Sequence, residues 1–270
     1  MSFAAFWKRN LGFFKMAIAS NVEYRVNYLV DAVVQPVVTA GIEILLWIGI
    51  FRTAGSDSIA GFGLQDYLTY ALWAAFFARI AASWMYEFRM IEEIDSGSIN
   101  GLLVRPMSFY EYYLSQLLGY KAVTTLVSFL VPLGVGLTMG WQVPFERLPI
   151  ALLLVFFYLF LVHSISFVVS TFSFFLNRIY TLTIAKNLAL ALVTGELIPL
   201  DLLPEPWRGW ILLLPFPSGV YIPVGYLTGR IGLDLVWQGF TSVAVSILII
   251  NIIGVALWRR GLRSYAGTGA

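Results

Sequence analysis

The sequence predicts an all-α integral membrane protein with six transmembrane helices. Of its 270 residues, 59% are hydrophobic and only 12% are charged, whereas soluble proteins average about 45–50% apolar and about 25% charged residues. The mean hydropathy is +0.81. One core cannot bury so much apolar surface in a chain of this size, so lipid must cover much of it. The composition therefore excludes a soluble enzyme.

The first predicted element, residues 1–24, is an amphipathic helix that lies at the membrane interface. At 100° per residue, Phe3 and Trp7 fall on an apolar side, while Lys8 and Arg9 fall elsewhere. Such a helix places its aromatic side in lipid and its basic side towards anionic head groups. The alternative is a cytoplasmic extension of the first span. A cleaved signal peptide would carry its positive charge before the apolar stretch, which is not the order found here.

Six segments are apolar and long enough to cross a bilayer, which takes about 20 residues. They cover about 27–51, 67–88, 118–140, 149–176, 179–198 and 235–258. With the N-terminus inside, most of the 17 Lys and Arg residues fall on the cytoplasmic side, so both termini are predicted to be cytoplasmic. No internal repeat or linker is visible, which favours a single transmembrane domain over residues 1–270.

Residues 198–230 are predicted to form a re-entrant hairpin that caps the outer side. Pro215, Pro217 and Pro223 interrupt its apolar stretch, and proline removes a hydrogen-bond donor and clashes with the preceding turn. The stretch is therefore not counted as a seventh span. Irregular apolar backbone is tolerated at membrane depth only where protein or water satisfies its polar groups.

The cytoplasmic segment 91–106 is unusual for a connecting loop. It is acidic at its start, is broken by Gly97 and Gly101, and closes at Pro106. It also places apolar residues where water is expected, namely Ile91, Ile94, Ile99, Leu102 and Leu103. Such residues predict a docking surface, and the alternative is a solvated loop.

Polar and ionisable residues inside the predicted spans are candidates for a translocation path, because charges are costly in a bilayer. They are Asp31, Gln35, Thr39, Glu43, Arg79, Lys186 and Glu196. In the first span, Asn27, Asp31, Gln35 and Thr39 recur at steps of four residues. This spacing predicts one polar ridge, with Glu43 above it. From their depth, we expect Asp31 to pair with Lys186 and Glu43 to pair with Arg79. The alternative is that these ion pairs only fix helix packing.

The sequence offers little for catalysis. It has no cysteine and one histidine, and none of its lysines follows a glycine, so the G-x-x-x-x-G-K-[ST] phosphate loop is missing. We expect no catalytic residue, metal site or cofactor in this chain. His163 has no evident partner for proton relay and is expected to make an inter-helix hydrogen bond. The Phe-rich run 156–175 is expected to face lipid.

The ordered combination of these features resembles the permease subunits of ABC-2 type ABC exporters, in the compact six-span branch without a fused ATPase. The resemblance covers nearly the whole chain, from the interfacial helix to the proline-rich hairpin between the fifth and sixth spans. Its local motif, a small residue, an apolar pair and a basic residue before proline, is carried by Gly97, Ile99, Leu102, Leu103, Arg105 and Pro106.

This resemblance implies a half-transporter in a bacterial cytoplasmic (inner) membrane. A second permease copy or paralogue would pair with it, and two separate ABC ATPase subunits would bind ATP and Mg in the cytoplasm. The 91–106 segment would be the coupling helix, with contacts from Glu92, Glu93, Ile94, Asp95, Gly97, Leu102, Arg105 and Pro106. The first and fifth spans would line the subunit interface and the substrate path.

The predicted function is export from the cytoplasm. Acidic groups beside aromatic residues favour hydrophobic or cationic toxic compounds, as in multidrug efflux, and lipid or lipid-linked glycan export is the alternative. A secondary transporter usually shows inverted repeats, which are not visible here. A membrane-embedded enzyme would need metal ligands, and the acidic cluster 92–95 has no His or Lys partner. A scaffold subunit remains a further alternative. The net charge of +2 predicts no nucleic-acid partner.

Overall fold

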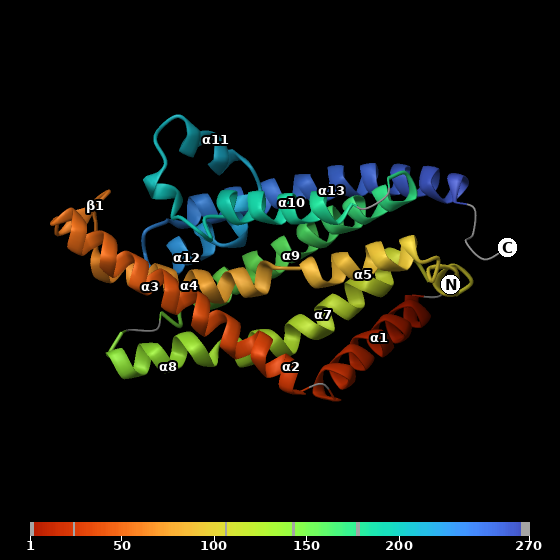
Figure 1. Cartoon of the computed structure of the whole chain (residues 1–270), viewed down its shortest axis with the longest axis horizontal. Helices are drawn as coiled ribbons and strands as arrows, with labels where there is room; N and C mark the ends of the chain where they lie inside the picture. Colours follow the sequence, from red (N-terminus) through yellow and green to blue (C-terminus); the bar gives the residue numbers. More distant parts are fainter. Residues whose placement is uncertain (1–2, 24, 106, 142–143, 177–178, 266–270) are drawn as a thin grey trace.

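The computed structural model describes residues 3–23, 25–105, 107–141, 144–176 and 179–265 as an elongated bundle of helices (Figure 1). The elements are α1 (Phe3–Glu23), α2 (Arg25–Leu29), the π-helical η1 (Val30–Val34), α3 (Gln35–Ala54), β1 (Ser58–Ile59), β2 (Phe62–Gly63), α4 (Leu64–Ala81), α5 (Trp84–Asp95), α6 (Asn100–Leu103), α7 (Phe109–Ser128), α8 (Leu130–Met139), α9 (Leu148–Thr171), η2 (Phe172–Phe174), α10 (Tyr180–Val193), η3 (Leu200–Leu202), α11 (Trp207–Leu213), η4 (Phe216–Gly219), α12 (Tyr221–Leu227) and α13 (Leu233–Ser264). The start of α1, the end of α13 and the end of α5 lie at one end of the long axis, and β1 lies at the other (Figure 1).

Four helical segments in the described part of the chain are long and apolar enough to cross a membrane. They are Val30–Ala54, Phe109–Met139, Leu148–Phe174 and Leu233–Ser264. These segments coincide with the first, third, fourth and sixth predicted spans and confirm an all-α membrane protein. The window 179–198 differs, because α10 has only 14 residues and ends at Val193. Gly195 then adopts a left-handed φ of +82°, which favours glycine and ends the helix.

The first span contains a π-helical turn, Val30–Val34, shortly before Pro36. Proline has no N–H, and its ring crowds the carbonyl four residues earlier, which here belongs to Ala32. A π turn is wider than an α turn and accommodates this change. The Ala32 carbonyl instead accepts a hydrogen bond from the Ser128 hydroxyl of α7 at 2.6 Å. The Ala32 carbonyl, which receives no N–H from Pro36, thus connects the first span to α7.

The predicted span 67–88 is not one continuous helix. The helix α4 ends at Ala81, and α5 begins at Trp84. Ala82 between them takes an extended backbone with φ −68° and ψ 134°, so the Arg79 carbonyl loses the amide that it would pair with in a continuous helix. The Lys121 ammonium of α7 donates to that carbonyl at 2.5 Å. A cation that is only 1% exposed therefore caps the break.

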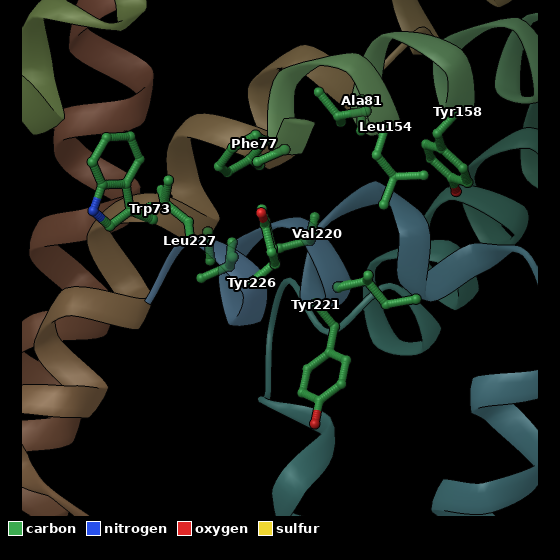
Figure 2. Packing of buried hydrophobic residues seen from close by; sticks show 14 of the residues in the cluster. Trp73, Phe77, Ala81, Leu154, Tyr158, Val220, Tyr221, Tyr226 and Leu227 are labelled. Atoms are coloured by element: carbon green, nitrogen blue, oxygen red, sulfur yellow. The ribbon is translucent and has the colours of Figure 1, made fainter. Parts of the chain in front are cut away.

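The largest core lies where α9 meets α4, α12 and α13 (Figure 2). Tyr158 of α9 is fully buried there, and Gly219 allows its approach, because a Cβ at Gly219 would lie 2.6 Å from the Tyr158 ring. Further along α9, Phe167 is buried and packs against Tyr110 and Trp258 at ring-centroid distances of 5.3 and 5.2 Å. The expectation that the Phe-rich run faces lipid is therefore wrong for Phe167, since α9 is enclosed by neighbouring helices.

The helix α1 packs along α7. This confirms a helix in the predicted 1–24 segment, of which residues 1–2 and 24 lie outside the described residues. Arg9 donates to the Glu111 carboxylate at 2.7 Å. The Ser115 hydroxyl donates to the Asn10 side-chain oxygen at 3.0 Å. At least one basic side chain of this helix thus contacts protein.

Replacing Gly119 with alanine is expected to separate α1 from α7. A Cβ at Gly119 would lie 2.7 Å from both the Ala17 Cβ and the Phe14 carbonyl oxygen, and the Phe14 backbone retreats only if α1 moves. Overpacking of this kind costs about 1–3 kcal/mol, which exceeds the roughly 1 kcal/mol that alanine gains over glycine in a helix. Thermal unfolding in detergent and protease cleavage of α1 measure the effect.

Gly134 of α8 provides the matched control for this substitution. It is also helical, and a Cβ built there meets nothing within 4 Å. Gly134→Ala is therefore expected to keep or raise stability. Equal stability of the two variants would show that α1 does not depend on the contact at Gly119.

Candidate functional site

A cavity of about 210 Å³ lies between α3, the α4–α5 break, α9, α10 and η4. Its polar lining consists of Gln35, Thr39, Arg79, Ser83, Tyr158, Asn187, Thr194 and Glu196. Alanines of α4 and α10, among them Ala75 and Ala191, leave room between these helices. Four of the seven predicted path residues thus line one cavity. The other three do not: Asp31 lines a smaller pocket across the break, and Glu43 and Lys186 are absent from both linings.

Arg79 joins the cavity to a buried charge cluster. Its guanidinium pairs with the Asp31 carboxylate of the π turn and donates to the Tyr120 hydroxyl at 2.6 Å. Lys121 lies close enough to interact electrostatically with both charges, so the cluster holds two cations and one carboxylate. The expected pairing of Arg79 with Glu43 is wrong. The Arg79 side chain reaches the π turn and not the middle of α3.

Lys186 of α10 pairs with Glu87 of α5. The Glu87 carboxylate is fully buried and also accepts a hydrogen bond from the Ser166 hydroxyl of α9 at 2.6 Å. The hydroxyls of Ser166 and Ser83 lie 2.9 Å apart, so this network reaches the helix break. The expected pairing of Lys186 with Asp31 is wrong, because α5 supplies a nearer carboxylate.

Glu43 of α3 and Glu196 beyond α10 form no ion pair with any residue that the structure describes. The two carboxylates lie near enough for their charges to interact. Glu196 lines the cavity, so it places a carboxyl group there that has no cationic partner among the described side chains. A cationic ligand in the cavity would pair with the ionised form of this group.

His163 is fully buried, and its Nε2 lies 3.1 Å from the Tyr110 carbonyl of α7. This contact confirms the expected inter-helix hydrogen bond. Within the described ranges, no group of three or more His, Asp or Glu residues is arranged to hold a metal ion.

The predicted coupling segment is folded against its own chain. Gly97 adopts a left-handed φ of +76°, which glycine takes without strain and which reverses the chain after α5. Ile94, Ile99 and Leu102 then pack with Phe109 and other aromatic residues of α7. The expected apolar docking surface is therefore wrong for these three residues and for the fully buried Ile91.

The exposed part of this segment differs from the predicted one. Leu103 is 40% exposed and Val104 is 85% exposed. Glu92, Asp95 and Arg105 are also exposed, whereas Glu93 is half-buried and Gly97 is buried; Pro106 lies outside the described residues. Two acidic and two apolar side chains of this segment are thus exposed, with Arg105 directly after them in the chain. We call these four residues the α5–α6 surface (Glu92, Asp95, Leu103 and Val104).

The proline-rich segment 198–230 is organised around the Asp201 carboxylate. It accepts hydrogen bonds from the Tyr221 hydroxyl at 2.6 Å and from Arg208 at 3.0 Å, and Arg230 lies 3.7 Å away. Figure 2 shows the Tyr221 hydroxyl directed away from the main core. Burial, followed by the hydrogen bond to Asp201, raises the pKa of Tyr221 to about 12, so the phenol keeps its proton. Arg230 also stacks on the Phe62 ring, 4.0 Å from its centroid.

Sequence reasoning missed five charged residues of these networks: Glu87, Lys121, Asp201, Arg208 and Arg230. Each is a charge in an apolar or proline-rich stretch, which was a usable signal. The sequence does not indicate which residue each of these charges pairs with.

The comparison with protein-family models gives one match for this chain. A family described as "ABC-2 family transporter protein" matches residues 37–269. The match extends from α3 to the end of the chain and includes both the cavity and the α5–α6 surface. A search of curated proteins found no match.

Proposed function

Because the chain belongs to the ABC-2 transporter family, we propose that it is the permease subunit of an ATP-driven exporter. It pairs with a second permease copy or paralogue and with two separate ABC ATPase subunits. These subunits bind ATP and Mg and carry out hydrolysis, so this chain is not itself an enzyme. The observation that carries the proposal is the exposed α5–α6 surface, which the fold leaves uncovered beside a chain reversal.

The α5–α6 surface suits a partner with a basic, partly apolar cleft. Glu92 and Asp95 supply negative charge, and Leu103 and Val104 add two consecutive apolar side chains that are 40% and 85% exposed. The buried Ile94 and Leu102 pack this segment against α7. We therefore assign the coupling role to the exposed residues of 91–105 and a supporting role to the buried ones.

The proposed topology has six crossings of a bacterial inner membrane, with both termini in the cytoplasm. The α4 and α5 helices together form the second crossing. The 14 residues of α10 extend about 21 Å at 1.5 Å per residue, which is less than the roughly 30 Å of a bilayer core. Residues 198–230 complete the fifth crossing as an outer re-entrant cap over α10.

The proposed substrate is a hydrophobic or cationic toxic compound. The cavity has alanine walls, neutral hydrogen-bonding groups and the carboxylate of Glu196, whereas the charge of Arg79 is already compensated by Asp31. A cationic solute would find a carboxyl group there that no described cation pairs with, and it would stabilise the ionised form of that group. Lipid or lipid-linked glycan export is the alternative, and hydrophobic cations that stimulate ATP hydrolysis by the purified complex would favour the first substrate class.

Reversing the charge of the α5–α6 surface tests the proposed function. The variant Glu92→Lys/Asp95→Lys is expected to lose the ABC ATPase that co-purifies with the chain in mild detergent, by more than tenfold. The control Asp57→Lys/Glu146→Lys reverses two exposed acids elsewhere and is expected to retain it. Glu93 is left unchanged because it is half-buried.

The same preparation separates the alternatives. A second, different permease in the complex would make the exporter heteromeric. A chain that purifies without an ATPase and moves a solute along an ion gradient would overturn the ABC assignment in favour of a secondary transporter. Retention of the ATPase by the charge-reversed variant would overturn the assignment of the α5–α6 surface as the ATPase contact.

A further inference from the structure

The helix α10 forms one wall of the cavity and is loosely packed. Among its 14 residues, Thr183 is the only buried one. Leu182, Ile184 and Leu188 are 47%, 61% and 60% exposed, so no broad packed face holds the helix in this chain. Its position therefore depends on a few specific contacts.

Two of these contacts hold the end of α10 near Glu196. The Thr194 carbonyl accepts a hydrogen bond from the Tyr221 amide at 2.9 Å. The Gly195 carbonyl accepts one from the buried Tyr70 hydroxyl of α4 at 2.7 Å. This end of the helix is thus fixed to α12 and α4.

The other half of α10 is held by α5. Lys186 pairs with the fully buried Glu87, and the ring of Tyr180 stacks on that of Phe88 at a centroid distance of 5.6 Å. The residues that follow Lys186, namely Asn187, Leu190 and Ala191, line the cavity. A displacement of Glu87 would therefore move Lys186 and, with it, the part of α10 that lines the cavity.

The helix α5 is mechanically separate from α4. The break at Ala82 and Ser83 removes helical hydrogen bonds between them. The end of α4 is fixed independently, because Lys121 holds its Arg79 carbonyl and Asp31 holds the Arg79 guanidinium. A tilt of α5 about the break, against its packed neighbours α7 and α9, would therefore not require α4 to move with it.

We propose that the Glu87–Lys186 pair is the link through which movement of α5 shifts α10 and reshapes the cavity. This inference rests on the proposed function, in which the ATPase acts on the α5–α6 surface. Glu87 lies at one end of α5 and the α5–α6 surface lies at the other, so one rigid helix joins both. Glu87 and Lys186 act as positioning residues, since neither lines the cavity.

A single reporter in the cavity wall tests this link. The chain has no native cysteine, so Asn187→Cys, directly after Lys186, gives one thiol on the α10 wall of the cavity. In the complex with its ATPase, the rate of maleimide labelling is measured without nucleotide and with ATP plus vanadate. We expect a several-fold nucleotide-dependent change in the labelling rate of the otherwise unsubstituted chain.

In the Glu87→Gln background, the labelling response is expected to be lost while the ATPase stays bound and hydrolyses ATP. Glu87→Gln/Lys186→Gln leaves no lone buried charge and is expected to lose the response as well. Lys186→Arg keeps the ion pair and is expected to retain it. Glu111→Gln, which breaks the Arg9–Glu111 ion pair elsewhere, is the matched control and is expected to retain it.

Each outcome has a distinct meaning. A labelling response that persists in both glutamine variants would overturn the link and leave the proposed function intact. The absence of any response in the unsubstituted chain, with the ATPase bound and active, would do the same. A chain that purifies without an ATPase would overturn the proposed function and the link together.

Discussion

Replacing Asp31 with asparagine is expected to lower the free energy of unfolding by about 3–5 kcal/mol, the cost of removing one partner of a buried ion pair. Asp31 is the only carboxylate in a cluster with Arg79 and Lys121. Arg79 is 7% exposed and Lys121 is 1% exposed, so little water reaches these two side chains to compensate for the lost charge. Chemical unfolding in mixed micelles measures the difference.

The same cluster predicts a smaller effect for Arg79→Met. This change leaves Asp31 beside Lys121, so one cation and one carboxylate remain and the net charge of the cluster falls to zero. The exposed Asp57→Asn is the control and is expected to stay within about 0.5 kcal/mol of the unsubstituted chain. A loss from Arg79→Met as large as that from Asp31→Asn would contradict the two-cation, one-carboxylate description.

The spans themselves were largely predictable from the sequence. Apolar windows report the thickness of the bilayer, and four of the six coincide with long helices. The break at Ala82 and Ser83 was not predictable, because no proline or glycine marks it. Its stability comes from Lys121, which lies about 40 residues later in the chain and donates to the Arg79 carbonyl. A tertiary contact of this kind leaves no local pattern.

The missed break also explains the wrong ion pairs. Depth along a straight helix placed Arg79 near Glu43, but the chain bends after Ala81, and α5 brings Glu87 to Lys186 instead. The residue types and their placement inside the membrane were correctly identified. Which charged residues meet depends on how each helix is rotated about its axis and tilted, and a hydropathy profile contains neither.

Burial inside the bundle was the second limit of the sequence. In a membrane protein, lipid-facing and protein-facing positions are both apolar, so composition does not separate them. Phe167 was expected to face lipid, and Ile94 and Leu102 were expected to face a partner, yet all three are buried in the chain's own core. The apolar residues that this segment leaves exposed are instead Leu103 and Val104.

Replacing Asp201 with asparagine is expected to loosen the proline-rich segment and to destabilise the protein by roughly 3 kcal/mol, at the low end for a broken buried pair. The carboxylate is 9% exposed. It forms ion pairs with the guanidinium groups of Arg208 and Arg230 and accepts a hydrogen bond from the Tyr221 hydroxyl. Arg230 is 6% exposed, and asparagine would leave its charge buried without a carboxylate beside it.

The loss of stability is expected to come mainly from the Asp201–Arg230 pair and less from the Asp201–Arg208 pair. Arg208 is 37% exposed, so Arg208→Met removes a pair that water screens and is expected to cost no more than about 1 kcal/mol. Asp201→Asn is expected to cost clearly more and to increase protease cleavage between residues 198 and 230. Asp234→Asn changes an exposed acid at the start of α13 and controls for the loss of one negative charge. If Asp201→Asn behaves like Asp234→Asn, the segment is held by its apolar contacts alone, and the Asp201 network does not fix α12 against α10.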